Sequence, residues 1–243
     1  MKGVLLAAGI GKRLRPITDR IPKPLIPVRG TPILEWIIRG LRDAGVTNLA
    51  IITGHLAEQL ESHFGTGSAL GVSLTYHRQE IRNGTGYAVL PAETMLRDAP
   101  FFLGYGDILV DPVNYRAMIE TFRSHPGDSV LSAWRVEDPS SCGALGIRDG
   151  KLVDLVEKPA PGQAPSNLIN AGLMVLQPGI FDEIHAIRPS PRGEYELTDA
   201  LLALAHRTNV WVHELTGFWS DVGTHEKLAE AESWFTSGDR RAE

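Results

Sequence analysis

The chain contains 243 residues, of which 43% are hydrophobic and 22% are charged, and its formal net charge is −5 at pH 7. These values are typical of one folded domain and exclude a disordered chain. The acidic balance excludes the overall basic field of nucleic-acid-binding proteins. The single cysteine, Cys142, fits a reducing compartment, and no apolar run is long enough to cross a bilayer. Met1-Lys2 leads directly into the first predicted strand, so we expect a cytoplasmic protein without a membrane partner.

Strand-like and helix-like segments alternate along the first half of the chain. Strand-like runs predict strands at residues 4–8, 49–53, 101–103 and 130–134, and alternation predicts one at residues 72–76. Helices are predicted near residues 55–64, 85–96 and 115–124. Another is expected to begin at Thr31-Pro32, as N-cap and first-turn proline, and to end at Gly45. This order predicts an α/β fold with a mostly parallel sheet, whose ligand site lies at the carboxyl ends of its strands.

The second half of the chain changes character. Strands are predicted at residues 147–148, 152–157, 169–176 and 210–215, with a turn at Asp149-Gly150, and helices near residues 179–186 and 198–207. Residues 159–165 are rich in Pro and Gly and indicate a loop rather than a domain linker. We therefore expect one domain over residues 1–243, with halves of about 1–135 and about 136–243, and a frayed segment at residues 237–243.

The segment after the first predicted strand combines small residues with cations. Gly9 and Gly11 have no Cβ atom, so the backbone N–H groups there stay open to a ligand. Lys12, Arg13 and, farther along, Lys23 add positive charge around this turn. Such a combination suits a polyanion, for example a nucleoside triphosphate.

The spacing of this segment does not fit the two commonest phosphate-binding loops. A dinucleotide fingerprint needs a small residue where Leu14 stands, and a P-loop needs Ser or Thr where Arg13 stands. An ordinary glycine turn between a strand and a helix would explain Gly9 and Gly11. It would not explain Arg13, or Lys23 held between two prolines.

Residues 5–25 resemble the signature of the sugar-1-phosphate nucleotidyltransferases, also called nucleotide-sugar pyrophosphorylases. That signature reads L-x-A-G/A-G-x-G-x-R-L-x-P-L-T, then P-K-P, and Lys12 replaces a frequent Thr or Ser. The other expected motifs recur in order along nearly the whole chain. The resemblance implies a Rossmann-like, glycosyltransferase-A-like nucleotidyltransferase domain with flanking helices. No hexapeptide ladder follows in this sequence, so the left-handed β-helix of some relatives, with its acyltransferase activity, is not expected.

The resemblance assigns the chemistry to Arg13, Lys23 and Asp107. Lys23 would contact the α-phosphate and Arg13 the departing pyrophosphate, where negative charge builds as the bond breaks. The alternative for Lys23 is a solvated loop lysine. The implied nucleotide-binding residues are Leu6, Ala7, Ala8, Gly9, Gly11, Lys12, Arg13, Lys23, Gln79, Gly84 and Thr85.

Two carboxylates are implied as ligands of Mg²⁺. Asp107 lies in a Gly-Asp pair just past a short apolar strand, and Asp221 matches the W-x-D-I/V-G-T segment of the family. Two carboxylates plus phosphate oxygens and water suit magnesium, which rarely takes an all-protein cage. Alternatively, Asp107 is a turn residue and Asp221 caps the final helix.

The nucleobase is expected at Gln79 and at residues 83–88, which resemble the G-T-G-H-A of uridylyltransferases with Tyr87 in place of His. A glycine turn opening a helix lets a base edge meet backbone groups and one side-chain amide. A plain helix N-terminus with Thr85 as N-cap is the alternative.

The sugar phosphate is expected at Gly143, Glu157, Lys158 and Asn170, because the E-K-P and N-A/T-G motifs of the family recur there. Glu157 and Asn170 would bond sugar hydroxyls, Gly143 would donate its amide, and Lys158 would neutralise the acceptor phosphate. Residues 194–199 also resemble a family segment, and a helix start with Thr198 as its cap explains them equally well.

The function implied is transfer of a nucleotidyl group from UTP to a sugar 1-phosphate, such as an N-acetylhexosamine or N-acetylmuramic acid 1-phosphate. The first half would bind the nucleotide and the second the sugar phosphate, and homo-oligomerisation is left open. Members that use dTTP, CTP or GTP, including phosphocholine cytidylyltransferases, and a regulatory relative without catalysis are alternatives. A nicotinamide-dependent oxidoreductase would need an acidic residue ending the second strand, which ends in Thr53-Gly54-His55.

Overall fold

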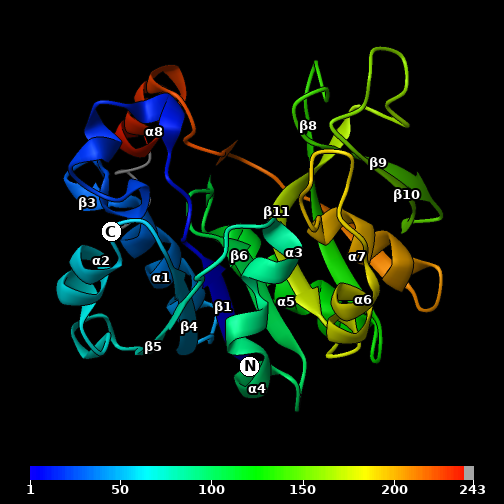
Figure 1. Ribbon diagram of the computed structural model, residues 1–243, viewed down its shortest axis with the longest axis horizontal. Coiled ribbons are helices and arrows are strands. Elements are labelled where there is room, and N and C mark those ends of the chain that lie inside the picture. The colour runs from blue at the N-terminus through cyan, green and yellow to red at the C-terminus, as the bar shows by residue number, and fades with distance from the viewer. Residues whose placement is uncertain (238–243) are drawn as a thin grey trace.

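A computed structural model of the chain describes residues 1–237 (Figure 1). Its centre is a nine-stranded sheet. In spatial order the strands are β5 (Ser73–Arg78), β4 (Asn48–Thr53), β1 (Lys2–Leu6), β6 (Phe101–Tyr105), β11 (Leu168–Leu176), β8 (Ser129–Arg135), β12 (Val210–Glu214), β10 (Lys151–Glu157) and β9 (Gly143–Arg148).

The sheet is parallel in its first half and mixed in its second. Strands β5, β4, β1 and β6 pair in parallel, as do β8 and β12, whereas β11 runs antiparallel to both of its neighbours, β6 and β8. Strand β1 lies between β4 and β6, so Leu5 is opposite Ile51 on one side and Gly104 on the other. The prediction of an α/β fold is confirmed.

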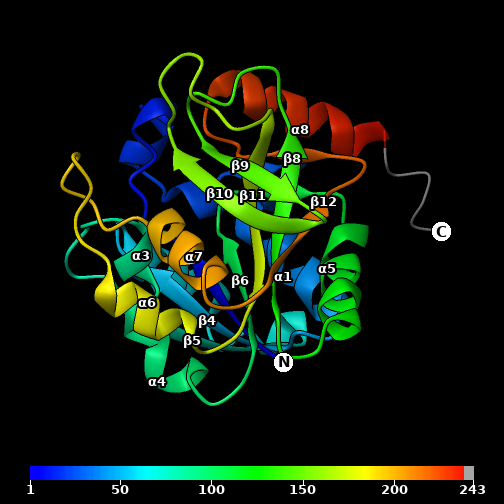
Figure 2. The same cartoon turned by 90° about the vertical axis from the view of Figure 1, so that its right-hand side faces the viewer.

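Helices cover both faces of the sheet (Figure 2). One core contains residues of α1 (Ile33–Asp43), α2 (Ala57–Phe64), α5 (Val113–Ser124) and α8 (His225–Ser237). The other contains residues of α3 (Thr85–Ala88), α4 (Glu93–Leu96), α6 (Ile180–Ala186) and α7 (Leu197–Ala205). Successive residues of β1 enter opposite cores, Val4 one and Leu5 the other. This explains why the strand reads as an unbroken apolar run.

Several predicted boundaries are wrong. Thr31–Pro32 forms a short strand, β3, paired with β2 (Pro27–Val28), so α1 begins at Ile33 without a side-chain cap. Residues 85–96 are not one helix: a 3₁₀ turn at Leu90–Ala92 separates α3 from α4, because Pro91 has no amide hydrogen to donate. Strand β9 begins at Gly143, earlier than expected, because it pairs with the full length of β10.

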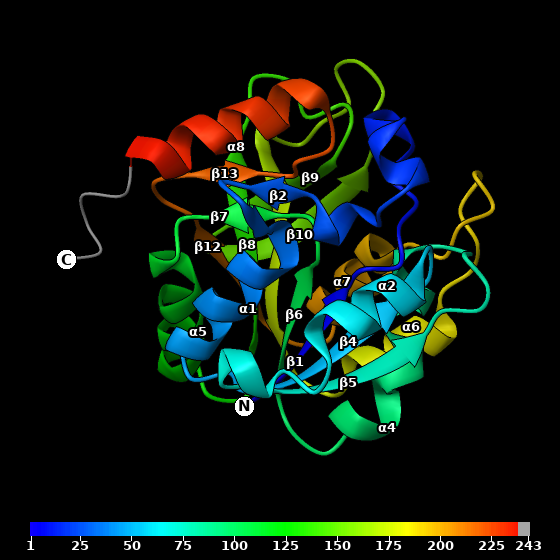
Figure 3. The same ribbon diagram turned by 90° about the vertical axis from the view of Figure 1, so that its left-hand side faces the viewer.

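The end of the described chain returns to the first half of the molecule. A small antiparallel sheet pairs β13 (Trp219–Ser220) with β7 (Leu109–Val110), and α8 packs beside β2 (Figure 3). The segment that contains β13 therefore lies near Asp107. Within residues 1–237, no helix is long and apolar enough to cross a membrane. The predicted frayed segment, apart from Ser237 in α8, lies outside the described residues.

Candidate active site

The opening turn lies at the carboxyl ends of the parallel strands. Ala7 donates its amide hydrogen to the carbonyl of Ile52 at 2.9 Å, and Gly106 donates to the carbonyl of Leu6 at 2.9 Å. The turn is therefore fixed between the ends of β4 and β6. A Cβ atom at Gly106 would lie 3.0 Å from the Cβ of Ala7, so small residues are needed at this junction.

A cavity of about 420 Å³ opens beside this turn. Eight of the predicted nucleotide-binding residues line it, namely Leu6, Ala7, Ala8, Gly9, Lys23, Gln79, Gly84 and Thr85, together with Asp107. Gly11, Lys12 and Arg13 follow in the turn and are not part of the lining. Arg82, Tyr105 and Glu194 also line the cavity, although only Glu194 lies in a segment with a predicted family resemblance, and none of the three was predicted as a site residue.

The Asn83–Gly86 turn is held by a segment from the other half of the chain. Gly86 donates its amide hydrogen to the carbonyl of Tyr195 at 2.8 Å, and Tyr195 donates to Asn83 at 2.7 Å. Gly84 has φ +122°, a conformation that L residues rarely adopt, and a Cβ atom there would lie 2.3 Å from the Tyr195 carbonyl oxygen. Tyr87 stacks on Tyr195 with ring centroids 3.9 Å apart.

This packing corrects two predicted helix caps. The residue at the N-cap of α3 is Gly84, while the Thr85 hydroxyl accepts the amide hydrogen of Leu197 at 3.1 Å. The N-cap position of α7 is Glu196, and Thr198 is buried inside the helix. The Thr85 side chain therefore contacts the second half of the chain, and Thr198 lies beside Gly143 within that half; neither caps its helix.

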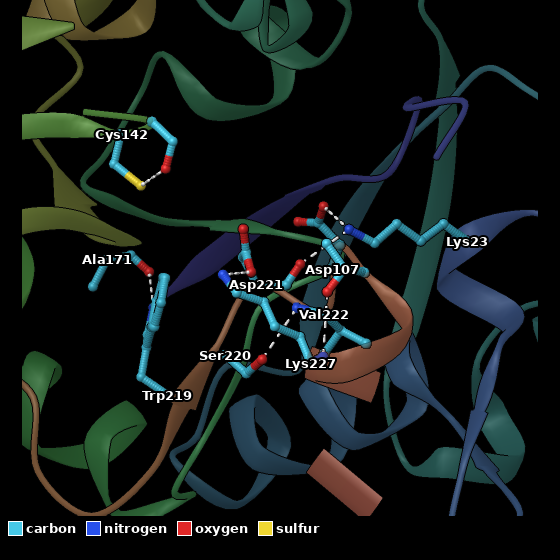
Figure 4. A network of polar contacts seen from close by, with 11 residues as sticks. Lys23, Asp107, Cys142, Ala171, Trp219, Ser220, Asp221, Val222 and Lys227 are labelled. Atoms are coloured by element: carbon cyan, nitrogen blue, oxygen red, sulfur yellow. Dashed lines mark hydrogen bonds and ion pairs between the residues drawn. The ribbon is translucent and has the colours of Figure 1, made fainter. Parts of the chain in front are cut away.

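Lys23, Asp107, Asp221 and Lys227 form one group, which we call the cation–carboxylate cluster (Figure 4). The Lys23 ammonium donates to Oδ2 of Asp107 at 2.6 Å and to the backbone carbonyl of Asp221 at 3.0 Å. These partners lie 84 and 198 residues away in the sequence. Lys227 forms an ion pair with Oδ1 of Asp221. The Lys23 side chain is only 9% exposed, so it is not a solvated loop lysine.

Arg13 extends toward the same segment. A Cβ atom at Gly223 would lie 2.6 Å from Nη2 of Arg13, so the guanidinium group lies directly against the Gly223 backbone. Arg13 itself is exposed. In the first turn of α8, Thr224 accepts the amide hydrogen of Lys227 at 3.3 Å, and Asp221 is therefore not the cap of the final helix. The structure thus brings Arg13, Lys23, Asp107 and the Asp221 segment to one place.

Three of the predicted sugar-binding residues also lie together. A Cβ atom at Gly143 would lie 3.2 Å from Oε2 of Glu157, 3.8 Å from the Cβ of Asn170 and 3.0 Å from Cγ2 of Thr198. These residues come from β9, β10, β11 and α7. The register of β11 against β8 is interrupted after Asn170, whose side-chain carbonyl accepts the amide hydrogen of Gly172 at 2.9 Å.

The charges around Glu157 are unevenly compensated. Burial raises the pKa of Glu157, and the negative charge of Glu196 raises it further. Arg192 lies 2.7 Å from Glu196 and 3.6 Å from Glu157, and its positive charge partly compensates the negative charges of both carboxylates. Lys158 is half exposed, with its ammonium 3.9 Å from Glu157. Arg192 was not singled out in the sequence, although it precedes the 194–199 motif by two residues.

Tyr105 connects the nucleotide cavity with the Glu157 group. It lines the cavity, and burial raises the pKa of its phenol. The charges of Glu157 and Asp107 raise this pKa further. A Cβ atom at Gly172, which donates its amide hydrogen to Asn170, would lie 2.5 Å from Cδ2 of Tyr105. The two predicted subsites therefore adjoin each other at the end of β6.

The carboxylates of the cluster offer a small ligand set for a metal ion. Within residues 1–237, no group of three or more His, Cys, Asp or Glu side chains gathers to hold a metal. Asp107 reaches the Lys23 ammonium with its carboxylate, whereas Asp221 reaches it with its backbone carbonyl and pairs its carboxylate with Lys227. Such a pair fits an ion that takes most of its ligands from water and phosphate, as Mg²⁺ does.

The family model described as nucleotidyl transferase matches residues 2–237. The chain belongs to this family. The match covers both predicted halves. It identifies the opening turn as that of a nucleotidyltransferase and not of a nicotinamide-dependent oxidoreductase.

Named members of the family share about a third of the sequence. The chain is 37% identical to the low-salt glycan biosynthesis nucleotidyltransferase Agl11 of Haloferax volcanii over 95% of its length, and to the bifunctional protein GlmU of Methanococcus maripaludis over 92%. It is 34% identical to a glucose-1-phosphate thymidylyltransferase of Streptomyces griseus over 95%. It spans 65%, 51% and 64% of the lengths of these relatives.

Solved structures of the family superpose along nearly the whole chain. A UDP-glucose pyrophosphorylase complexed with UDP-glucose is 28% identical, with a TM-score of 0.88 over 97% of this chain and 98% of that one. A putative glucose-1-phosphate thymidylyltransferase from Bacillus anthracis is 31% identical, with a TM-score of 0.87 over 96% and 94%. The Rossmann-like nucleotidyltransferase fold is confirmed.

Proposed function

We propose that this protein transfers a nucleotidyl group from a nucleoside triphosphate to a sugar 1-phosphate and releases pyrophosphate. The observation that carries the proposal is the position of Lys23 and Asp107. Both line the cavity beside the opening turn, and Lys23 also bonds the Asp221 segment. A cavity edged by open backbone amides and fixed cations can bind a triphosphate and stabilise the charge that develops as pyrophosphate leaves.

The reaction needs alignment and charge neutralisation rather than a base. A phosphate oxygen of the sugar 1-phosphate attacks the α-phosphorus in line, and the bond from that phosphorus to the β-phosphate oxygen breaks. The acceptor phosphate is already ionised at neutral pH, so no proton has to be removed and no covalent enzyme intermediate is required. Lys23 serves the α-phosphate, Arg13 the pyrophosphate and Lys158 the acceptor phosphate, which otherwise would be repelled by the triphosphate.

Asp107 and Asp221 are the residues that would hold Mg²⁺. When bound, the ion supplies positive charge to the phosphate oxygens beyond what the side chains provide. The backbone amides near Gly9 and Gly11 hold the rest of the triphosphate, and the buried side chain of Lys23 keeps Asp107 and the Asp221 segment in position.

The nucleotide-binding half, about residues 1–135, is proposed to select UTP through Gln79, Gly84 and Thr85, which line the cavity. The second half is proposed to bind the sugar of an N-acetylhexosamine or N-acetylmuramic acid 1-phosphate through Gly143, Glu157 and Asn170. The named relatives include both a thymidylyltransferase and a UDP-glucose pyrophosphorylase. UTP therefore competes with dTTP as the first substrate to test, ahead of CTP and GTP.

A pyrophosphate-release screen tests the proposal. Each of UTP, dTTP, CTP and GTP is combined with a panel of sugar 1-phosphates and phosphocholine, with and without Mg²⁺. We expect metal-dependent release with one triphosphate and one class of acceptor, and loss of release in Lys23→Met. Lys151→Met is the matched control, because Lys151 begins β10, a strand that contains no residue of the cluster. Binding of nucleotide sugars without any release would instead favour a regulatory protein.

A further inference from the structure

Each candidate metal ligand is paired with a lysine of the protein itself. Lys23 bonds Asp107 at 2.6 Å, and Lys227 pairs with Asp221 (Figure 4). The pair of Lys227 and Asp221 is partly open to solvent, since the two side chains are 37% and 25% exposed. Lys23 belongs to the opening signature, whereas nothing in the sequence pointed to Lys227.

The position of Lys227 is unfavourable for a cation on local grounds. It lies in the first turn of α8, where the positive end of the helix dipole disfavours a positive charge. The ammonium lies 5.5 Å from the centre of the Trp219 ring. That ring is itself fixed, because Trp219 donates its indole hydrogen to the carbonyl of Ala171 at 2.9 Å. Lys227 is therefore held in place by Asp221 and by an anchored aromatic ring.

The charges of the cluster cancel before any ligand arrives, because two ammonium groups face two carboxylates. If Asp107 and Asp221 held a divalent cation, Lys23 and Lys227 would compete with it for their carboxylates. A triphosphate in the adjoining cavity would compensate the added charge and draw the ammonium groups away from the carboxylates. Metal binding should consequently be weak alone and strong with nucleotide.

We propose that Lys227 is a positioning residue that competes with the divalent cation for Asp221 and so makes metal binding depend on bound nucleoside triphosphate. This inference rests on the proposed function, in which Asp107 and Asp221 hold the metal. It gives Lys227 a function that does not require contact with either substrate. Removal of the ammonium group should free Asp221 and tighten metal binding to the nucleotide-free protein.

Binding of Mn²⁺ to the nucleotide-free protein, followed by electron paramagnetic resonance, tests this inference. In Lys227→Met, the unbranched stem remains and the charge is lost. We expect the Kd for Mn²⁺ to fall about fivefold, the factor that corresponds to ~1 kcal/mol for a partly exposed ion pair. Lys227→Arg keeps the positive charge and should bind Mn²⁺ no more tightly than the wild type. Damage to the structure would weaken binding, so a gain in affinity is specific to the proposed competition.

Lys151→Met is the matched control, because Lys151 also lies over a tryptophan ring, 4.8 Å from that of Trp211, and is distant from the cluster in the sheet order. It should leave the Kd for Mn²⁺ unchanged. Lys227→Gln is the second variant if the methionine variant does not fold. Unchanged or weaker binding in the folded Lys227 variant overturns this inference alone. Wild-type binding that Asp107→Asn and Asp221→Asn do not weaken overturns the metal site as well.

Discussion

Replacement of Lys23 by methionine tests how the cation–carboxylate cluster contributes to stability. The substitution keeps the unbranched stem but removes the hydrogen bonds of 2.6 Å to Asp107 and 3.0 Å to the carbonyl of Asp221. Loss of the partner of a buried polar group costs about 1–3 kcal/mol. The Asp107 side chain is 38% exposed, and water recovers part of this loss. We expect the free energy of unfolding to fall by ~2 kcal/mol, which lowers Tm by about 4–8 °C for a domain of this size.

The same variant should lose turnover by a much larger factor than its stability loss explains. Removal of one fixed donor to a developing negative charge costs about 100- to 1,000-fold in kcat. Pyrophosphate release is measured well below the Tm of the variant, with circular dichroism to show that it is folded and Lys151→Met as the control. Turnover near that of the wild type would remove Lys23 from the mechanism.

A double-mutant cycle assigns the stability loss to the pair. Asp107→Asn leaves Lys23 with a neutral acceptor, and the double variant lacks both the ammonium and the carboxylate. Because the two groups touch, the coupling energy should be about 0.5–3 kcal/mol. If the losses in the single variants simply add, the short contact between Lys23 and Asp107 does not stabilise the fold.

Three further substitutions test other parts of the site. Gly84→Ala forces a Cβ atom to within 2.3 Å of the Tyr195 carbonyl at φ +122°. It should lower Tm more than Gly30→Ala, which has φ +77° but open space; equal losses would contradict the contact. In Glu157, a pKa raised above the ordinary 4.5 means that the folded protein loses stability as pH rises through the window above that value. The Tm of Glu157→Gln minus that of the wild type should therefore increase between acidic pH and pH ~8. A difference in Tm that does not vary with pH would refute this. Asp107→Asn should raise the half-saturating Mg²⁺ concentration at least about tenfold, the lower end of the loss seen when even a residue that only orients a metal ligand is replaced. An unchanged titration would exclude Asp107 as a ligand.

Elements whose formation depends mainly on their own residues could be predicted from the local sequence. Residues 4–8 are apolar without alternation, and β1 is covered on both faces as that pattern requires. The order of strands and helices was enough for the α/β class. The opening turn could be located because glycine and cations have a chemical meaning that does not depend on distant residues.

Contacts between distant segments could not be predicted from local patterns. Thr31-Pro32 has the composition of a helix start, but pairing with Pro27–Val28 makes it a strand. Thr85 and Thr198 also have the composition of helix caps. The 194–197 segment instead packs on the Asn83–Gly86 turn, and this uses the Thr85 hydroxyl in a tertiary contact. The ion pair between Lys227 and Asp221 could not be predicted either, because it depends on how α8 is oriented after the Asp221 segment.

The antiparallel direction of β11 explains how one sheet edge can serve both substrates. Parallel strands bring their carboxyl ends to the same edge, which is where β1 and β6 deliver the opening turn and Asp107. Strand β11 runs the other way beside β6, with Leu173 opposite Gly104, so its beginning, at Asn170, lies at that edge. Strand β6 thus separates the opening turn on one side from the residues proposed to bind the sugar on the other. In the proposed reaction, Tyr105 and Asp107, at and just past its end, would therefore lie where the attacking phosphate meets the α-phosphate.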